Sequence, residues 1–340
     1  MMNRGMRNAL LVAMAAVMAA AGCAKSEKTE PNAADQRYLE AWMQINHPSA
    51  AQTDLGVYVI DEQEGTGAVY DGEPYVYARY VVRTLDGTIT STNIEKIAQQ
   101  VGSYDKAAYY GPGVWIIAED MIAAGVQDMI QGMKVGGTRT AVIPSWLMTT
   151  KRYKKPSEYI KHSTDNETSI YTVELSAVTE NVLDSECDSC EAFAKKYLDG
   201  LDSLSYGFYY KQLVEPTDTN AFPSDTSVYI NYTGRLLNGQ VFDTTVEDTA
   251  KFYNIYSSSA TYEPVQITWG ENWSEITMGT SDGSSSSLIS GFQKTLWKMR
   301  HYEKAVGMFI SPYGYGYSGS GSRIPSFSPL LFEIEIVDEP

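Results

Sequence analysis

The spacing of apolar and polar residues divides the chain into two long units with the same internal order. Apolar residues recur at helical spacing near residues 35–46 and again near residues 188–201, and each spacing predicts an amphipathic helix. Segments in which apolar and polar residues alternate follow each helix, and this period of two predicts half-buried strands. The pattern therefore indicates a repeat of two large units.

The repeat is clearest in one hairpin of each unit. The stretch "YVYARYVVRTLDGTI" at residues 75–89 aligns without a gap with "SVYINYTGRLLNGQV" at residues 227–241, which places Tyr80 opposite Tyr232. The glycine in "LDG" and in "LNG" predicts a tight turn, because glycine adopts positive φ at little steric cost. Both units thus contain the same predicted strand, turn and strand.

The remainder of each unit continues the match. "AAGVQDMIQGMKVGGTRTAVIP" and "ISGFQKTLWKMRHYEKAVGMFISP" both predict a short helix, a turn and a strand, and "SIYTVELSAV" and "LLFEIEIVDE" both predict a closing strand. We therefore expect the α+β class: two domains, each an antiparallel curved sheet wrapped on a short helix, with an extra N-terminal helix. The boundary between the units is expected near residues 181–186.

The composition fits two globular units and argues against several functions. With 340 residues, of which 43% are hydrophobic, the chain is long enough for a packed core in each half. The formal net charge of −16 argues against nucleic acid as a partner, since phosphate binding needs basic patches. His47, His162 and His301 lie far apart without ligand spacing, so we expect neither a metal site nor a histidine-based triad.

The first 22 residues predict a secretory signal peptide. A basic start is followed by an apolar run and by small residues up to Cys23. The ending "AAGC" resembles a bacterial lipobox, which predicts a lipidated Cys23 and a polar tether over residues 23–34. We expect an exported, membrane-anchored bacterial lipoprotein that faces the periplasm or the cell surface. The alternative is an ordinary signal peptide with a chance cysteine.

The other two cysteines, Cys187 and Cys190, form a "CDSC" pair at the junction of the two units. In an exported protein such a pair can be redox-active or joined as a disulfide. The polar segment "VLDSE" precedes it, however, where a thioredoxin-like site would have a strand. We therefore favour a pair within the linker, oxidised or not, without a catalytic role.

The second unit carries a set of short motifs in a characteristic order. These are "INYTG", "FDTT", "VQITWG", "LISGF", "GYGYSG", "RIPS" and "LLFEIEI". In this order they resemble the FKBP-type peptidyl-prolyl cis-trans isomerase family, over roughly residues 205–338. The resemblance implies a hydrophobic cup that takes a prolyl ring.

The family's pocket can be carried over position by position onto this sequence. The resemblance implies that the backbone N–H of Ile289 and the hydroxyl of Tyr315 hold substrate carbonyls. It implies that Asp243 contacts the carbonyl of the twisting amide or holds Tyr232. The implied catalytic residues are Tyr232, Phe242, Asp243, Ile289, Phe292, Tyr315 and Phe332, and the implied substrate-binding residues are Val265, Ile267, Leu288 and Ile324.

The implied chemistry needs no metal, nucleophile or cofactor. Rotation about an X–Pro amide faces a barrier of ~18–20 kcal/mol, and the twisted amide loses resonance and polarity. A dry aromatic pocket favours this twisted form over the planar, well-solvated one. Each pocket residue taken singly is also explained as core, and only their joint order points to a site.

Several positions depart from the family's pattern. Phe292 stands where the family has tryptophan, and Val265 and Ile267 stand where it has aromatic wall residues. Residues 271–287 form an insertion before the pocket helix, with a Ser/Gly run that is typical of a flexible segment. These departures bear on the rate of catalysis more than on the fold.

The first unit matches the skeleton of the second but lacks its pocket residues. Thr90 and Ser91 stand opposite Phe242 and Asp243, and Val126 stands at the floor position. We therefore expect a degenerate domain without activity. The expected organisation is residues 35–180 for the degenerate domain, 181–204 for a linker and helix, and 205–340 for the isomerase domain.

Three functions remain open from the sequence. The first is a peptidyl-prolyl isomerase that assists the folding of exported proteins, with proline-containing peptides or unfolded chains as partners. The second is a catalytically weak or inactive peptide-binding or chaperone module with the same cup. The third is a glycan-binding surface built on exposed aromatics such as Trp269 and Trp273. Burial of Tyr232, Phe242, Phe292 and Phe332 around a pocket would favour the first two.

Overall fold

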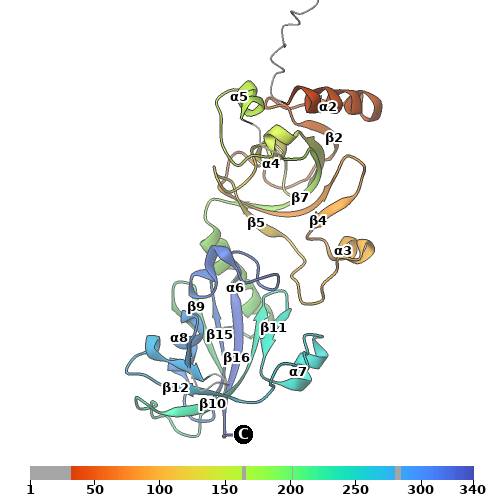
Figure 1. Cartoon of the computed structure of the whole chain (residues 1–340). Coiled ribbons are helices and arrows are strands. Elements are labelled where there is room, and N and C mark those ends of the chain that lie inside the picture. Colours follow the sequence, from red (N-terminus) through yellow and green to blue (C-terminus); the bar gives the residue numbers. More distant parts are fainter. Residues whose placement is uncertain (1–31, 163–165, 201, 280–284) are drawn as a thin grey trace, which may run out of the picture.

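The computed structural model describes residues 32–162, 166–200, 202–279 and 285–340 and contains two α+β domains (Figure 1). The first domain ends with β7 (Ser169–Thr179), and helix α6 (Val182–Tyr197) begins the second. The predicted signal peptide, Cys23 and most of the tether lie outside the described residues.

The described part of the first domain forms a seven-stranded antiparallel sheet. The strands follow the order β1-β2-β6-β7-β3-β4, and β5 also pairs with β3. The elements are α2 (Ala33–Asn46), β1 (Ala51–Gln52), β2 (Tyr58–Gln63), β3 (Tyr75–Arg83), β4 (Ile89–Thr92), α3 (Glu95–Val101), β5 (Gly113–Ile116), α4 (Ala124–Ile130), β6 (Thr138–Ile143), η1 (Ser145–Leu147), α5 (Pro156–Lys161) and β7.

The second domain repeats this plan in a nine-stranded sheet. Its order is β14-β13-β12-β10-β16-β15-β9-β8, and β11 also pairs with β10. Its elements after α6 are β8 (Asp202–Ser205), β9 (Phe208–Val214), β10 (Ser227–Leu236), β11 (Val241–Thr244), α7 (Glu247–Phe252), β12 (Val265–Thr268), η2 (Trp273–Glu275), β13 (Thr277–Gly279), β14 (Ser285–Ser287), α8 (Ser290–Lys298), β15 (Lys304–Phe309), η3 (Ser311–Tyr313), η4 (Gly316–Ser318) and β16 (Leu330–Val337).

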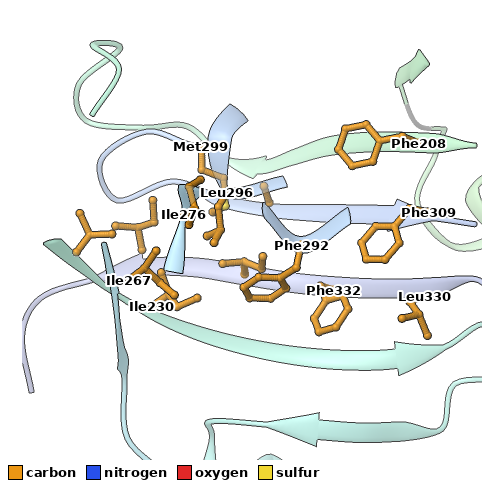
Figure 2. Packing of buried hydrophobic residues seen from close by; sticks show 14 of the residues in the cluster. Phe208, Ile230, Ile267, Ile276, Phe292, Leu296, Met299, Phe309, Leu330 and Phe332 are labelled. Carbon is orange, nitrogen blue, oxygen red and sulfur yellow. The ribbon is translucent and has the colours of Figure 1, made fainter. Parts of the chain in front are cut away.

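In each domain one short helix packs its apolar side against the sheet. In the second domain Phe292 and Leu296 of α8 are buried among strand residues that include Phe309 and Phe332 (Figure 2). In the first domain α4 buries Val126 and its neighbours in the same way. Removal of this apolar surface from water is the main source of stability in each domain.

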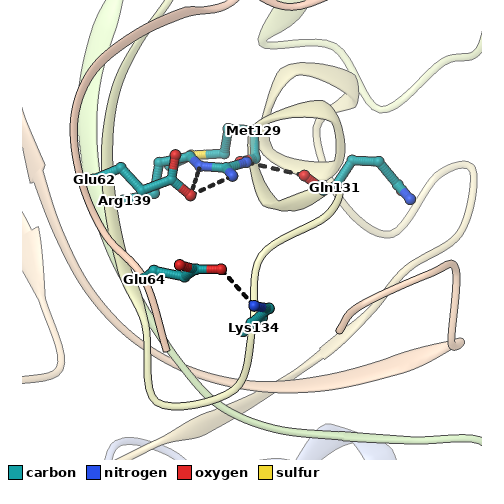
Figure 3. Close-up of polar contacts among 6 residues, drawn as sticks. All are labelled: Glu62, Glu64, Met129, Gln131, Lys134 and Arg139. Carbon is teal, nitrogen blue, oxygen red and sulfur yellow. Dashed lines mark hydrogen bonds and ion pairs between the residues drawn. The ribbon is translucent and has the colours of Figure 1, made fainter. Parts of the chain in front are cut away.

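The side chain of Arg139 connects α4 with the sheet of the first domain (Figure 3). Its guanidinium donates to the carbonyl of Met129 at 2.6 Å and to that of Gln131 at 3.0 Å, near the C-terminal end of the helix. It also forms an ion pair with Glu62 on β2 at 2.6 Å. A cation suits this position because the last carbonyls of a helix lack partners and carry partial negative charge.

Helix α6 is packed onto the second domain and is longer than the sequence pattern indicates. It begins at Val182, where the side chain of Asn181 accepts a hydrogen bond from Leu183 N. Cys190 is buried against the sheet, Cys187 is half-buried, and both thiols are free. Buried Glu186 accepts hydrogen bonds from Ser311 N at 2.6 Å and Ser311 Oγ at 2.7 Å, and burial raises the pKa of its carboxyl.

The two domains touch through loop segments and through Tyr75 at the start of β3. The segment after α3 extends toward the second domain (Figure 1), where Tyr109 N donates to Ser322 O at 2.8 Å. The side chain of Gln240 donates back to the carbonyl of Ala108 at 3.3 Å. The rings of Tyr75 and Phe327 meet edge to face at 5.6 Å. These contacts place the loop at residues 314–329 between the domains.

The part of the chain that the structure describes has no helix that is both long and apolar enough to cross a membrane. Within the same residues, no group of three or more histidine, cysteine, aspartate or glutamate side chains is arranged to hold a metal ion.

Candidate functional site

The second domain contains a cavity of about 530 Å³ between β10, β11, α8 and the loop at residues 314–329. The alternation along each strand turns some side chains toward α8 and the others away from it, so residues from distant parts of the sequence converge on this cavity. Nine of the residues that the family resemblance implies line it: Tyr232, Phe242, Asp243, Leu288, Ile289, Phe292, Tyr315, Ile324 and Phe332.

Aromatic rings packed edge to face form the floor of this cavity. The ring of Phe332 lies 4.8 Å from that of Phe292 and 5.5 Å from that of Phe242, both in T-shaped contact. The ring of Tyr232 meets Phe292 at 5.5 Å in the same manner. Such pairs contribute roughly 0.5–1.5 kcal/mol each beyond the burial of their area. The floor is therefore stiff and apolar.

The floor depends on a glycine in β10. Gly234 pairs with Asp243 of β11 on one side and with Phe332 of β16 on the other. A Cβ atom at this position would lie 2.5 Å from the Phe242 ring and 2.9 Å from the Phe332 ring. Only a residue without a side chain allows both rings to approach the strand, which is why the "YTG" motif ends in glycine.

A polar group stands at the rim. The hydroxyl of Tyr232 donates to Asp243 Oδ2 at 2.7 Å, and Asp243 itself is exposed. Burial raises the pKa of the Tyr232 phenol, and the Asp243 carboxylate raises it further. Burial also raises the pKa of Tyr315. Both phenols therefore keep their protons at neutral pH and remain hydrogen-bond donors.

The start of α8 and the side chain of Arg323 complete the rim. Ile289 is the N-cap of α8, with φ −62° and ψ 142°, and its N–H donates to no group among the described residues. The resemblance implies that this N–H binds a ligand carbonyl. The side chain of Arg323 donates to the carbonyl of Phe242 at 3.1 Å and thereby fastens the loop that carries Ile324 over the cavity.

The structure places two of the implied substrate-binding residues elsewhere. Ile267 is fully buried in the core, and Val265 packs against that core, so neither lines the cavity. Both lie on the core face of β12. The cavity as the structure shows it is therefore lined without a residue of β12.

The cavity also has lining residues that the sequence did not indicate: Met278, Ser287, Ser320 and Arg323. Met278 and Ser287 belong to the insertion at residues 271–287, whose described parts form β13 and β14 and extend the sheet beside β12. Its Ser/Gly composition indicated only a flexible segment. The alternation in "EITMG" was the available signal for a strand.

Neither tryptophan that suggested a glycan-binding surface is exposed, since Trp273 is half-buried and Trp269 is buried. Trp269 is 2% exposed and packs on Phe222, with ring centroids 4.6 Å apart. Phe242, Phe292 and Phe332 are likewise buried around the cavity. This arrangement disfavours the glycan-binding hypothesis and favours a cup for an apolar group. An enclosed apolar floor with hydroxyl and N–H donors at its rim suits a neutral, ring-shaped group between two peptide bonds.

Comparison with known proteins identifies the same part of the chain. A family model described as FKBP-type peptidyl-prolyl cis-trans isomerase matches residues 219–337. FK506-binding protein 1A of Aspergillus fumigatus is 30% identical over 128 residues, which are 37% of this chain and 90% of that protein. A probable FKBP-type isomerase of Haemophilus influenzae is 24% identical over 164 residues, 48% of this chain and 56% of that protein. The chain thus spans about half of this bacterial relative and most of the fungal one.

Solved structures of this kind resemble the chain at low overall superposition. A peptidyl-prolyl isomerase from Pseudomonas syringae is 25% identical and covers 47% of this chain and 95% of its own, with a TM-score of 0.32. The structure of the three FKBP domains of a wheat protein is 16% identical. The match covers 84% of this chain and 95% of the wheat chain, with a TM-score of 0.30. At these scores the superpositions carry no argument about the geometry of the site.

Proposed function

Because this chain belongs to the FKBP-type peptidyl-prolyl cis-trans isomerase family, we propose that its second domain turns over X–Pro bonds in exported polypeptides. The observation that carries the proposal is the cavity of about 530 Å³, which gathers nine of the implied site residues around one aromatic floor. The substrate class is a proline-containing segment of an unfolded or partly folded chain.

The geometry accounts for catalysis without a covalent step. The prolyl ring enters the cup against Phe292 and Phe332 and leaves water behind. The twisted amide is less polar than the planar one, so desolvation costs it less, and the cavity binds it better. The N–H of Ile289 and the hydroxyl of Tyr315 hold the flanking carbonyls while the amide rotates.

Isomerase activity of the soluble chain tests the proposal. The chain from residue 25 should accelerate cis-to-trans exchange of a blocked tetrapeptide with one X–Pro bond, which takes tens to hundreds of seconds without a catalyst. The measurement is a protease-free assay at neutral pH. A folded, monodisperse sample that gives no acceleration would contradict the proposal. Binding of the same peptide without acceleration would support the alternative of a peptide-binding module.

We further propose that the protein works at a bacterial membrane through a lipid on Cys23. The sequence "AAGC" at the end of the signal supports this, as does the polar stretch before α2 begins at Ala33. In bacteria that export the full chain, Cys23→Ser should move the protein from the membrane fraction to the soluble fraction and abolish its labelling by radioactive palmitate. Cys187→Ser is the matched control and should leave both unchanged. Labelling that survives Cys23→Ser would refute the anchor.

A further inference from the structure

The first domain contains a hollow of about 570 Å³ at the position that the active cavity occupies in the second domain. The strand registers fix the correspondence. Val82 pairs with Ser91 and with Tyr171 in the first sheet, just as Gly234 pairs with Asp243 and with Phe332 in the second. The expected loss of the pocket residues is therefore accompanied by a changed cavity rather than by a filled one.

The second domain closes this hollow. Tyr317, Ser326 and Phe327 belong to its loop and line the cavity of the first domain. Tyr315 and Ile324, which line the active cavity, belong to the same loop. One loop therefore contributes to both cavities, with its two sides turned toward different domains.

The backbone of this loop is held in an unfavourable conformation at Phe327, which lines the hollow. Phe327 has φ 55°, which is rare and strained for a bulky residue. Its N–H donates to Gly316 O at 3.0 Å, and its ring meets Tyr75 edge to face. The strain places an aromatic ring at the wall of the hollow, although a glycine would close the turn more cheaply.

The lining of the hollow is apolar and aromatic, with hydroxyls at the rim. The rings of Tyr80 and Trp115 lie 5.8 Å apart, and Tyr171 lines the same space. Thr90 and Ser91 are exposed at the edge, where the Ser91 hydroxyl is 3.4 Å from that of Tyr80. None of the described lining residues is charged. A charged group buried here would find no ion partner, so its binding is disfavoured.

We propose that this hollow is a second peptide-binding site, which takes a neutral segment of an unfolded polypeptide with a large apolar side chain. Because the lining is neutral and aromatic, it suits a neutral segment with an apolar side chain. Because the loop at residues 314–329 lines both cavities, we infer that the occupant is polypeptide, as proposed for the second domain. The kind of occupant rests on the proposed function. The site holds its segment without isomerising it, because Ser91 replaces the carboxylate of Asp243 and Val126 replaces the aromatic floor of Phe292.

Trp115 is a local reporter for this site. The chain has six tryptophans, and Trp115 is the one among them that lines either cavity as far as the described residues show. The chain from residue 25 is labelled with 5-fluorotryptophan, and the Trp115 resonance is assigned by its loss in Trp115→Phe. The probe is acetyl-Gly-Ala-Phe-Ala-Gly-amide, which has no proline and no charge, and the second probe replaces its phenylalanine by glutamate.

The expected result is a saturable shift of the Trp115 resonance with the phenylalanine probe. Binding of the glutamate probe should be at least about tenfold weaker, the loss expected when one large apolar contact is replaced by a charge. Thr90→Trp fills the hollow from its exposed rim and should weaken binding of the phenylalanine probe by a similar factor. Thr88→Trp, on the same hairpin but outside the lining, is the matched control and should bind as the unmodified chain does.

Four outcomes would overturn the site. The first two are a Trp115 resonance that does not shift up to the solubility limit of the probe, and equal binding of the probe by Thr90→Trp and the unmodified chain. The others are saturable binding of decanoate with no binding of the peptide, and a loss of binding that Thr88→Trp shares with Thr90→Trp. The probe lacks proline, so its binding does not depend on isomerase activity. A chain that binds the probe but has no isomerase activity would contradict the proposed function and still support this site.

Discussion

Phe242→Ala combined with Asp243→Ala should lower kcat/KM for a blocked prolyl tetrapeptide by about 100-fold. Asp243 places a carboxylate beside the Tyr232 hydroxyl at 2.7 Å, and Phe242 closes the aromatic floor against Phe332. An electrostatic contact that strengthens in the transition state is worth about 100-fold or more on its own. The double variant removes the rim charge and one wall together, and the protease-free assay measures the loss.

This first prediction needs a control of the same chemistry at another place. Phe252→Ala combined with Asp248→Ala changes the same residue types on α7, where Phe252 is 77% exposed and neither residue lines the cavity. It should leave kcat/KM unchanged. Because Phe242 is buried, Asp243→Leu alone is measured beside the double variant, since that exposed position can change without loss of the core. An active Asp243→Leu variant would exclude the carboxylate from catalysis.

The fold could be predicted from the sequence because it is present twice. The hairpin of residues 75–89 and that of residues 227–241 align without a gap, and the structure gives them matching strand registers. Two copies of one alternation constrain each other, so a chance pattern in either copy is filtered out. The α+β class followed from this agreement.

The site residues followed from the order of the motifs and the family that they resemble. Tyr232, Phe242 and Phe332 lie on strands, and all three line the cavity. Val265 and Ile267 also face inward, but they pack in the core and do not line the cavity. Alternation identifies the face of a strand but not the position along it at which a cavity ends.

The hollow of the first domain could not be predicted from the sequence. Its missing side chains are visible, since Thr90 and Val126 stand where the second domain has phenylalanines. Nothing local shows that Phe327, more than 200 residues later, forms part of its wall. Contacts between domains depend on the packing of two finished folds, and the period of a single segment contains no information about them.

Gly234→Val should abolish isomerase activity and lower the free energy of unfolding of the second domain by about 1–3 kcal/mol, the usual cost of overpacking a core. The new Cβ would lie 2.5 Å from the Phe242 ring and 2.9 Å from the Phe332 ring, so both rings must leave the floor. The measurements are the peptide assay and urea unfolding followed by near-ultraviolet circular dichroism, which reports on the packed aromatic rings.

The first domain provides the rescue for this variant. There Val82 occupies the position of Gly234, and Thr90 occupies that of Phe242, so a valine is accommodated beside a small neighbour. Gly234→Val combined with Phe242→Thr should therefore regain at least half of the lost stability relative to Gly234→Val, while activity stays absent because the floor is gone. Phe242→Thr alone completes the double-mutant cycle and should show a favourable coupling of about 0.5–3 kcal/mol between the two changes. Stabilities that simply add would mean that the glycine is not required by the phenylalanine ring, and the structural reason given for the "YTG" motif would fail.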